Sequence, residues 1–355
     1  MKEAKYLAIA RWIRENIENN HFKPGDKLIS ENQLCERFGI SRQTARQAVS
    51  LLEKEGLVTR KQGSGTYINN TPLSPSVSTR NIGLLITYWD EYIFPSIISG
   101  IEKVLSKNNY NMILRLTRNQ VDHERSHLKS LLEYGVDGLI IEGTKTALPN
   151  PNLDLYQQFH DRGIPVIFIN AYYPDMAGNY IVNDDITGAQ IATNYLIEKG
   201  HTKISGIFKH DDAQGKERYK GFMDAMYEHD LPVNEQSILW YSTESFAEQF
   251  SLEQIPLFLK KLGKSTAMIC YNDQITMKLI QLFTQNQVSL PEGFTFVSFD
   301  NSPLGTISPI PFSSITHPGK VMGNLAADSI LNMISNPQLT VRHVFTPELI
   351  VREAD

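Results

Sequence analysis

The sequence has few cysteines, no long apolar run and no amino-terminal export signal. Cys35 and Cys270 are the two cysteines among 355 residues, which excludes a disulfide framework and a cysteine-based zinc site. No apolar run reaches the ~18 residues that a membrane-spanning helix needs. The first twenty residues are charged throughout and lack the apolar core and cleavage site of a signal peptide. We therefore expect a cytoplasmic protein without a membrane partner.

Catalytic and metal-binding motifs are also scarce. The run Gly63-Ser64-Gly65 lacks the following lysine and the preceding buried strand of a phosphate-binding loop. The run KHDD at 209–212 has no second cluster at metal-ligand spacing, which indicates that no metal is bound. A sugar-modifying enzyme needs an acid–base pair, for which Glu142 with Asp300 is the one candidate. We predict that the protein is not an enzyme and needs no cofactor.

Charge is distributed unevenly along the chain. The formal net charge is −5, yet residues 1–70 hold 12 Lys or Arg and 8 Asp or Glu, while the other 285 residues hold 22 and 31. A basic amino-terminal region on an acidic remainder indicates that this region meets a polyanion. The length and the 41% hydrophobic content allow two or three globular domains.

Three helices are predicted in the amino-terminal region. Apolar residues at helical spacing predict the first over residues 4–19. Ser30 and Ser41 are the expected N-caps of a second helix, over 31–38, and of a third that continues to about Glu55. The second and third helices would share a small core with the first.

A hairpin and then a linker follow these helices. Two β-type runs flank residues 62–65, which is typical of a hairpin with a tight tip. Three helices and a hairpin predict a winged helix-turn-helix over residues 1–68, an α+β fold. Residues 69–80, NNTPLSPSVSTR, show no hydrophobic period and contain two prolines, so we predict a semi-extended linker.

The pattern changes from residue 81 onward. Near-continuous apolar runs such as NIGLLIT, DGLIIEG and FTFVSF alternate with helical stretches of about 10 to 20 residues, which indicates parallel α/β sheet. About 275 residues are too many for one ordinary set of layers, so we predict a two-lobed α/β domain over 81–355. The predicted lobes are 81–181 with 318–336, and 182–317 with 337–355.

Polar side chains gather at the start of the third predicted helix. Arg42, Gln43 and Arg46 occupy its first turn and a half, where a major-groove helix reads base edges. An arginine offers a bidentate fork to guanine. The alternative is an exposed basic face without a DNA function. The other residues predicted to contact DNA are Ser30, Ser41, Thr44, Lys61, Gln62, Gly63, Ser64, Gly65 and Thr66.

The segment SENQLCERFGISRQTARQAVSLLEKEGLVTRKQGSGTYI resembles the DNA-binding domain of GntR-family repressors. The shared patterns are S-E-x-x-L, S-R-x-T-x-R, L-x-x-E-G-L-V-x-R and G-x-G-T-x, and the resemblance covers almost all of residues 4–68. It implies that Arg42 and Arg46 read bases of double-stranded operator DNA. It also implies that Ser30, Thr44 and the hairpin tip lie near phosphates.

The remainder resembles lactose-repressor-type effector domains, which share their fold with periplasmic sugar-binding proteins. The residues that carry this resemblance are RYKGF (218–222), YND (271–273), SFDNSP (298–303) and GAQIATNYLIEKGHTKI (188–204). A GntR-type head on such a body is similar to the family of arabinose-operon repressors. That resemblance implies a homodimer, L-arabinose as the effector, and release of DNA when the sugar binds.

A monosaccharide site needs planar hydrogen-bonding groups and an aromatic platform, which loops at the carboxyl ends of parallel strands supply. The resemblance and the position after apolar runs indicate two sets of ligand contacts. The first predicted lobe contributes Tyr92, Phe94, Glu142, Lys145, Asn170 and Tyr172. The second contributes Arg218, Asn272, Asp273 and Asp300, and His317 lies where the chain recrosses between lobes.

Alternatives to these roles stay open. Asp184 and Asp273 are also suited to capping helices, and Glu142 with Lys145 to a surface ion pair worth under about 1 kcal/mol. Tyr172 is equally suited to covering the boundary between the lobes. We hypothesise a sugar-responsive transcriptional repressor. The competing hypothesis is a cytoplasmic sugar-binding or sugar-processing protein whose head binds no DNA.

Overall fold

The computed structural model divides the chain into two compact units. One is Met1–Thr79 with Gln157–Ile164, and the other is Arg80–Tyr156 with Pro165–Asp355. We call Met1–Thr79 the head, and we call the chain from Arg80 onward the body, so that α6 (Leu153–Asp161) is described whole with the body. Gln62, Tyr92 and linker residues 70–77 lie outside the described residues. The structure describes residues 5–18, 21–54, 56–61, 63–69, 78–89, 93–176 and 178–352.

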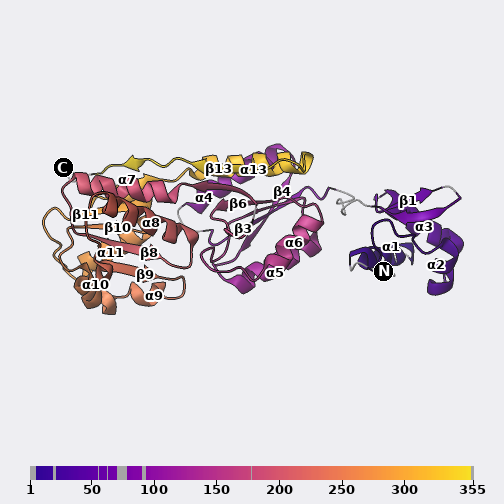
Figure 1. The fold of residues 1–355 in the computed structure, drawn as a ribbon, viewed down its shortest axis with the longest axis horizontal. Coiled ribbons are helices and arrows are strands. Elements are labelled where there is room, and N and C mark those ends of the chain that lie inside the picture. The colour runs from indigo at the N-terminus through magenta and orange to yellow at the C-terminus, as the bar shows by residue number, and fades with distance from the viewer. Residues whose placement is uncertain are drawn as a thin grey trace. The chain divides into compact units, whose positions relative to one another are not determined.

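Three helices and a two-stranded hairpin form the head (Figure 1). Ser30 caps α2 through a reciprocal pair of hydrogen bonds with Gln33, and Gly39 ends that helix in the left-handed conformation with φ of 59°. The Ser41 hydroxyl accepts the backbone N–H of Thr44 at 3.2 Å, which fixes the start of α3. The elements are α1 (Lys5–Glu18), α2 (Glu31–Phe38), α3 (Arg42–Lys54), β1 (Val58–Lys61) and β2 (Gly65–Ile68).

One apolar core holds the head together. The antiparallel register of β1 and β2 pairs Val58 with Ile68 and Lys61 with Gly65. Leu34 of α2 and Leu52 of α3 are fully buried beside the hairpin residue Val58. The winged helix-turn-helix predicted from the sequence is therefore confirmed.

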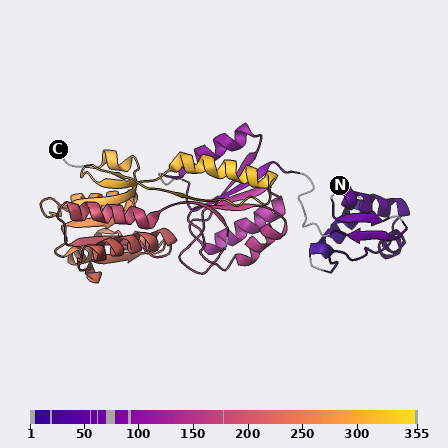
Figure 2. The same ribbon diagram turned by 45° about the horizontal axis from the view of Figure 1, so that its top comes forward.

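Two six-stranded sheets form the body (Figure 2). Lobe 1 is the part built on the sheet ordered β13-β7-β6-β5-β3-β4, and every pair in that sheet is parallel. Its strands are β3 (Asn81–Ile86), β4 (Asn111–Leu116), β5 (Gly138–Ile141), β6 (Val166–Asn170), β7 (Asn179–Asn183) and β13 (Arg342–Phe345).

Lobe 2 is built on the sheet ordered β14-β12-β11-β10-β8-β9, which is parallel except for the β12–β14 pair. An edge strand that runs against an otherwise parallel sheet is common in such folds. The strands are β8 (Ile204–Lys209), β9 (Ile238–Tyr241), β10 (Ala267–Cys270), β11 (Thr295–Asp300), β12 (Ser313–Thr316) and β14 (Leu349–Ile350).

Helices cover the sheets of both lobes. In lobe 1, α4 and α13 cross closely because Gly100 and Gly323 leave no room for a Cβ against the facing backbone. In lobe 2, α7 with α8 packs on one side of the sheet and α10 with α11 on the other (Figure 1). The helices are α4 (Phe94–Lys107), α5 (Val121–Tyr134), α6 (Leu153–Asp161), α7 (Asp185–Glu198), α8 (Ala213–Glu228), α9 (Phe246–Gln249), α10 (Ile255–Leu262), α11 (Asp273–Gln285), α12 (Leu304–Ile307) and α13 (Gly319–Ser335), with short 3-10 turns at Glu235–Ser237 and Leu252–Gln254.

The chain passes between the lobes three times. The passage between β12 and α13 falls at the predicted boundary, and the passage between β7 and α7 falls just after the predicted boundary at residue 181, which lies inside β7. The predicted third passage, near residue 337, is wrong because β13 (Arg342–Phe345) pairs in parallel with β7 of lobe 1. The return to lobe 2 therefore follows Phe345. No apolar run marks β13 in the sequence, since this strand is short and mostly exposed.

The two-lobed parallel α/β body is confirmed. Strands such as β5 and β10 are buried at every position, which explains their unbroken apolar sequences. Among the described residues, no helix is both long and apolar enough to cross a bilayer.

Candidate functional site

The start of α3 presents an exposed polar face. Arg42, Gln43 and Arg46 are exposed, whereas Ala45 and Val49 on the same helix are buried in the head core. The apolar side therefore fixes the orientation of the helix and leaves the polar side on the surface. Such a face, at the N-terminal end of a recognition helix, suits contact with base edges in a major groove.

Acidic side chains lie beside this face, and the sequence reasoning missed them. Glu31 of α2 lies 3.5 Å from Arg46 Nε and 3.6 Å from a guanidinium nitrogen of Arg60. Arg60 also pairs with Glu53 at 3.3 Å. These ion pairs are partly exposed, and they connect Arg46 and Arg60 to acidic side chains of the head. The S-E pattern after residue 29 was the available signal for Glu31.

The hairpin supplies the second part of the head surface. Gly63 and Gly65 have φ of 73° and 127°, which a residue with a Cβ adopts only at a cost, so the tight tip depends on them. Lys61 Nζ lies 4.9 Å from the ring centre of Tyr67, and the Tyr67 hydroxyl is 2.7 Å from that of Ser64. A surface groove lies beside the hairpin, and its lining includes Lys27, Ser30, Arg60, Lys61, Gly63, Gly65 and Thr66.

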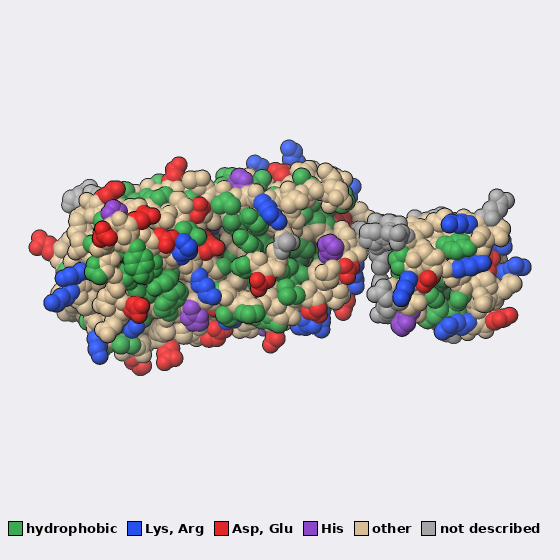
Figure 3. Space-filling model, viewed as in Figure 1, with side chains coloured by type: hydrophobic (Ala, Val, Ile, Leu, Met, Phe, Trp, Pro, Cys, Tyr) green, Lys and Arg blue, Asp and Glu red, His purple; other side chains and the backbone are tan. Residues whose placement is uncertain are grey.

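In the face of the molecule that Figure 3 presents, Lys and Arg side chains are scattered over the head together with acidic ones, and the body likewise carries both signs of charge. Ser30, Ser41 and Thr44 have defined structural roles at the starts of α2 and α3. Their hydroxyls lie at helix N-termini, where a phosphate is also favourably placed.

A cavity of about 280 Å³ lies between the lobes of the body. Five of the residues predicted from the sequence to bind ligand line it: Phe94, Glu142, Arg218, Asn272 and Asp300. Its lining also includes residues that the sequence reasoning did not select, among them Thr87, Thr146, Lys209, Asp212, Gln214, Tyr241, Thr243, Phe246, Tyr271 and Gln274.

Arg218 is the buried cation of this cavity. Its Nε donates to Asp185 at 2.7 Å, and Asp300 lies 3.9 Å from its guanidinium. The guanidinium also lies 4.2 Å from the ring centre of Phe299 and 4.9 Å from that of Tyr271. Burial alone would lower the pKa of Arg218, but Asp185 and Asp300 outweigh it and raise the pKa.

Glu142 is the buried acceptor contributed by lobe 1. It accepts hydrogen bonds from the backbone N–H of Thr87 at 3.0 Å and from the Thr87 hydroxyl. Asn170 donates to its other oxygen at 3.2 Å. Burial raises the pKa of Glu142, and these donors only partly offset that effect. A hydroxylated ligand would supply further donors to this carboxylate.

Lys209 and Asp212 add a second pair of charges to the cavity wall. Their ion pair is 2.6 Å long, and the Tyr271 hydroxyl donates to Asp212 at 3.1 Å. Gly215 brings the first turn of α8 against the backbone at Lys209 more closely than a Cβ would permit. The available signal for both residues was the polar run KHDD directly after an apolar strand, which the sequence reasoning considered only as a metal site.

Asn272 has a double position, at a helix start and in the cavity wall. Its Oδ1 accepts the backbone N–H of Ile275 at 3.0 Å and caps α11. The cap leaves the NH2 group as a donor for a ligand. Aromatic rings of Tyr241, Phe246 and Tyr271, all from lobe 2, supplement Phe94 of lobe 1 in the lining. The sequence reasoning sought the aromatic platform in lobe 1 alone.

The predicted ligand contacts that remain, among the residues that the structure describes, do not line this cavity. Asp273 is fully buried and accepts hydrogen bonds from Ser302 and Ser314, so it ties together the ends of lobe-2 strands. Burial raises its pKa to about 6. Asp184 caps α7 by accepting the backbone N–H of Thr187 at 2.9 Å, as the alternative interpretation proposed.

Asn170 and His317 lie behind Glu142. Gly319 N–H donates to His317 Nδ1 at 3.0 Å, so His317 Nε2 carries the proton that bonds Asn170 Oδ1 at 3.0 Å. Asn170 then donates to Glu142. Both residues therefore orient the cavity carboxylate without lining the cavity, and their direct contact with a ligand stays a prediction.

Tyr172 and Lys145 do not line the cavity either. Tyr172 stacks on Tyr180 with ring centres 4.4 Å apart, and both line a second cavity of about 220 Å³. Lys145 does not pair with Glu142, contrary to the alternative interpretation of these two residues. Its Nζ contacts Glu244 at 2.6 Å and Asp211 at 3.4 Å.

The main cavity therefore combines charged donors, carboxylate acceptors, amides and aromatic rings. Ligand pockets generally range from about 300 to 1,000 Å³, so its volume suits a small molecule. This combination matches the hydroxyls and the apolar face of a monosaccharide. Within the described residues, no group of three or more His, Cys, Asp or Glu side chains is arranged to hold a metal ion.

Comparison with known proteins agrees with both halves of this geometry. Residues 5–68 match the family described as bacterial regulatory proteins, gntR family, and residues 193–354 match the periplasmic binding protein-like domain. The body also resembles the solved transcription regulator CcpA of Lactococcus lactis, with a TM-score of 0.66 and 22% identity over 77% of this chain and 98% of that one.

Two relatives match over nearly the full length. An arabinose metabolism transcriptional repressor of Halalkalibacterium halodurans is 35% identical, over 99% of this chain and 96% of its own. A protein of the same description from Geobacillus stearothermophilus is also 35% identical, over 99% of this chain and 97% of its own.

Proposed function

This chain belongs to the family of arabinose metabolism transcriptional repressors, and we propose that it releases its operator when L-arabinose fills the body cavity. The observation that carries this proposal is the pairing, in one chain, of an exposed base-reading face with a small polyhydroxyl-type cavity. Arg42, Gln43 and Arg46 form the first, and Arg218 with Glu142 anchors the second.

Each cavity group has a role in this proposal. Arg218 donates to adjacent sugar hydroxyls, while Glu142, Asp212 and Asp300 accept from others. Asn272 and Gln214 supply amide donors, and an aromatic ring covers the apolar face of the sugar. Arg218 and Lys209 are already paired with Asp185 and Asp212, so binding the sugar requires little rearrangement of these charges.

Regulation requires the head and the body to act together. Two copies associate into a homodimer and present two heads to a pseudo-palindromic operator. Closure of the lobes around the sugar changes the geometry of the dimer, and the heads then no longer fit two half-sites. The competing proposal, a sugar-binding protein whose head has no DNA function, gains no support from the exposed α3 face.

Calorimetry of the full chain against a panel of sugars tests the effector assignment. L-arabinose should bind, while D-xylose, D-ribose and D-glucose should bind at least roughly tenfold more weakly, a difference of about 1.4 kcal/mol. Arg218→Ala is expected to abolish the heat of binding, and circular dichroism establishes whether the variant is folded. Equal affinities across the panel, or a folded Arg218→Ala variant with undiminished affinity, would overturn the assignment.

Selection of DNA sequences tests the proposed binding of the head to an operator. The full chain is incubated with random-sequence duplexes, and bound DNA is sequenced after several rounds. The proposal predicts an inverted repeat with a fixed half-site spacing. Enrichment of no common sequence would favour the competing proposal.

A further inference from the structure

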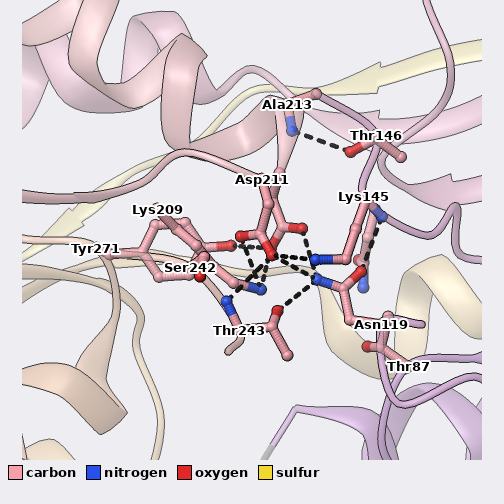
Figure 4. A network of polar contacts seen from close by, with 12 residues as sticks. Thr87, Asn119, Lys145, Thr146, Lys209, Asp211, Ala213, Ser242, Thr243 and Tyr271 are labelled. Carbon is pink, nitrogen blue, oxygen red and sulfur yellow. Dashed lines mark hydrogen bonds and ion pairs between the residues drawn. The ribbon is translucent and has the colours of Figure 1, made fainter. Parts of the chain in front are cut away.

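A polar network joins the lobes next to the cavity (Figure 4). We call it the inter-lobe network. Lobe 1 contributes Asn119, Lys145 and Thr146, and lobe 2 contributes Asp211, Asp212, Ala213, Thr243 and Glu244. Of these residues Thr146, Asp212 and Thr243 also line the cavity, whereas Asn119, Lys145, Asp211 and Glu244 do not.

Asn119 is the centre of the network. The residue is fully buried, and its Nδ2 lies 2.6 Å from Thr243 Oγ1 and 3.3 Å from both Asp211 Oδ2 and Asp212 Oδ1. Its Oδ1 accepts the backbone N–H of Lys145 at 2.8 Å. One side chain of lobe 1 thereby holds two cavity residues of lobe 2 and one neighbour in its own lobe.

Lys145 supplies the charge of the network. Its Nζ contacts Glu244 at 2.6 Å and the buried carboxylate of Asp211 at 3.4 Å. Asp211 also accepts the backbone N–H of Thr243 at 3.1 Å. Nearby, Thr146 Oγ1 accepts the backbone N–H of Ala213 at 2.9 Å. All of these contacts except the one between Asp211 and Thr243 cross between lobes, so separation of the lobes at this edge would break them together.

Two of the three lobe-1 residues of the network, Asn119 and Lys145, have a backbone conformation that is uncommon for residues other than glycine. Asn119 has φ of 53° and Lys145 has φ of 49°, both in the left-handed region. Asparagine tolerates that region, whereas lysine adopts it at an energetic cost. Such strain persists where surrounding contacts over-determine the conformation, and it gathers at ligand clamps.

We propose that Asn119 and Lys145 are positioning residues of the effector cavity, which hold Asp212 and Thr243 in place across the lobe boundary. Neither residue touches the sugar. Their contacts stabilise the arrangement of the lobes seen in the structure and so raise the affinity for any ligand that binds that arrangement. This proposal rests on the proposed function of the body as a sugar-binding domain.

The first test compares Asn119→Ala with Asn152→Ala in the full chain. Asn152 is also fully buried, but its Nδ2 donates to Val121 O and Glu124 Oε1, both at 3.1 Å and both within lobe 1. Calorimetry measures L-arabinose affinity, and stopped-flow fluorescence measures the association and dissociation rates. Asn119→Ala should weaken binding roughly tenfold or more, chiefly through faster dissociation, because it loses hydrogen bonds to charged partners.

Asn152→Ala should lower the melting temperature with little change in sugar affinity. Wild-type affinity and dissociation rate in a folded Asn119→Ala variant would overturn the proposal. Equal weakening by the two substitutions would do so as well, because it would assign Asn119 a purely structural role.

A second test uses the more exposed ion pair, whose loss leaves the fold intact. Lys145→Met, Glu244→Gln and the double variant form a cycle for sugar affinity. Each single change should weaken binding roughly two- to fivefold, and the double variant should be no weaker than Lys145→Met. The loss should shrink in about 0.5 M salt because ions screen an exposed pair. Additive losses of sugar affinity in the double variant, or losses that do not change with salt concentration, would contradict the role of Lys145.

The two proposals fail separately. If another pentose of the panel binds and L-arabinose does not, the effector assignment is wrong, and the same variants are measured with that pentose. If L-arabinose binds equally well to wild type and Asn119→Ala, the positioning role is wrong and the effector assignment stands.

Discussion

The head and the body place their functional side chains in opposite ways. In the head, Arg42 and Arg46 stand on the surface of one helix whose other side forms the core. In the body, Arg218 is 2% exposed and already pairs with Asp185. The exposed DNA-binding residues of the head therefore contribute little to its stability. The buried ligand-binding residues of the body contribute both to binding and to stability.

The contrast has a physical origin in the two ligands. DNA is a long polyanion that is bound from outside, so mobile exposed cations suit it. A small neutral sugar offers only hydroxyls and one apolar face, and hydrogen bonds to it gain strength when water is excluded. Substitutions in the two regions should therefore differ in what they change.

The largest expected effect is on the stability of the body. Arg218→Met leaves Asp185 and Asp300 without their cation, and removing one partner of a buried pair usually costs about 3–5 kcal/mol. Urea unfolding of the full chain measures it. Arg125→Met is the matched control, because Arg125 pairs with Asp154 at 2.8 Å on the surface and should change stability far less. A similar loss of unfolding free energy in both variants would contradict the expected difference between buried and exposed ion pairs.

The head should show the reverse behaviour. Arg42→Ala with Arg46→Ala should cost about 1–3 kcal/mol of specific operator affinity for each base that is no longer read. Stability should change by less than about 0.5 kcal/mol per residue, because both side chains are exposed. Fluorescence anisotropy with operator and calorimetry with sugar decide the matter. A variant that still prefers operator over random DNA would contradict the assigned reading face.

The body should also lose stability in mild acid through His317. Burial lowers the pKa of His317 to about 4, with Arg218 adding to the effect and Asp300 opposing it. The unfolded chain protonates its histidine near pH ~6.5. The contribution is therefore complete above about pH 6.5 and is lost as the pH falls from about 6.5 to about 4. We expect a loss of about 3 kcal/mol by about pH 4.

Unfolding of wild type and His317→Gln across this pH range isolates the contribution. The difference between the two proteins should change steadily from about pH 6.5 to about 4 and stay constant above about pH 7. A constant difference throughout would show that His317 is not held neutral by its surroundings.

The smallest effect should come from the hairpin. Lys61 is exposed near the tip, and Lys61→Ala should weaken DNA binding about equally for all sequences. The slope of log affinity against log salt should fall by about one, the value expected when one phosphate is no longer neutralised. Anisotropy titrations from about 50 to about 300 mM salt measure the slope, with Lys107→Ala on the body as a control. An unchanged slope would show that Lys61 does not neutralise a DNA phosphate.

Much of the head could be predicted from the sequence because its signals are local. Ser30 and Ser41 lie beside the helices that they cap, and the glycines of the tip lie close together in the chain. The ion pairs of Glu31 were missed because they depend on how α2 packs against α3. Local sequence patterns do not predict which polar side chains of two packed helices come into contact.

The body could be predicted as a fold but only in part as a site. Strand ends indicated Glu142, Asn272 and Asp300, and the family resemblance of RYKGF indicated Arg218. All four residues line the cavity. The position of a residue directly after a strand does not predict whether its side chain lines the cavity or points away from it. Lys145 lies after β5 just as Glu142 does, but its left-handed backbone directs it toward Glu244.

Transmission between the body cavity and the head is the central claim, and one titration tests it most directly. Operator affinity of the full chain is measured by anisotropy without sugar and with saturating L-arabinose, using Arg218→Ala as a control that should not respond. Allosteric coupling usually falls between about 1 and 3 kcal/mol, so we predict that the sugar weakens operator binding roughly 5- to 150-fold. The same dissociation constant with and without L-arabinose, in a protein shown to bind the sugar, would contradict the account.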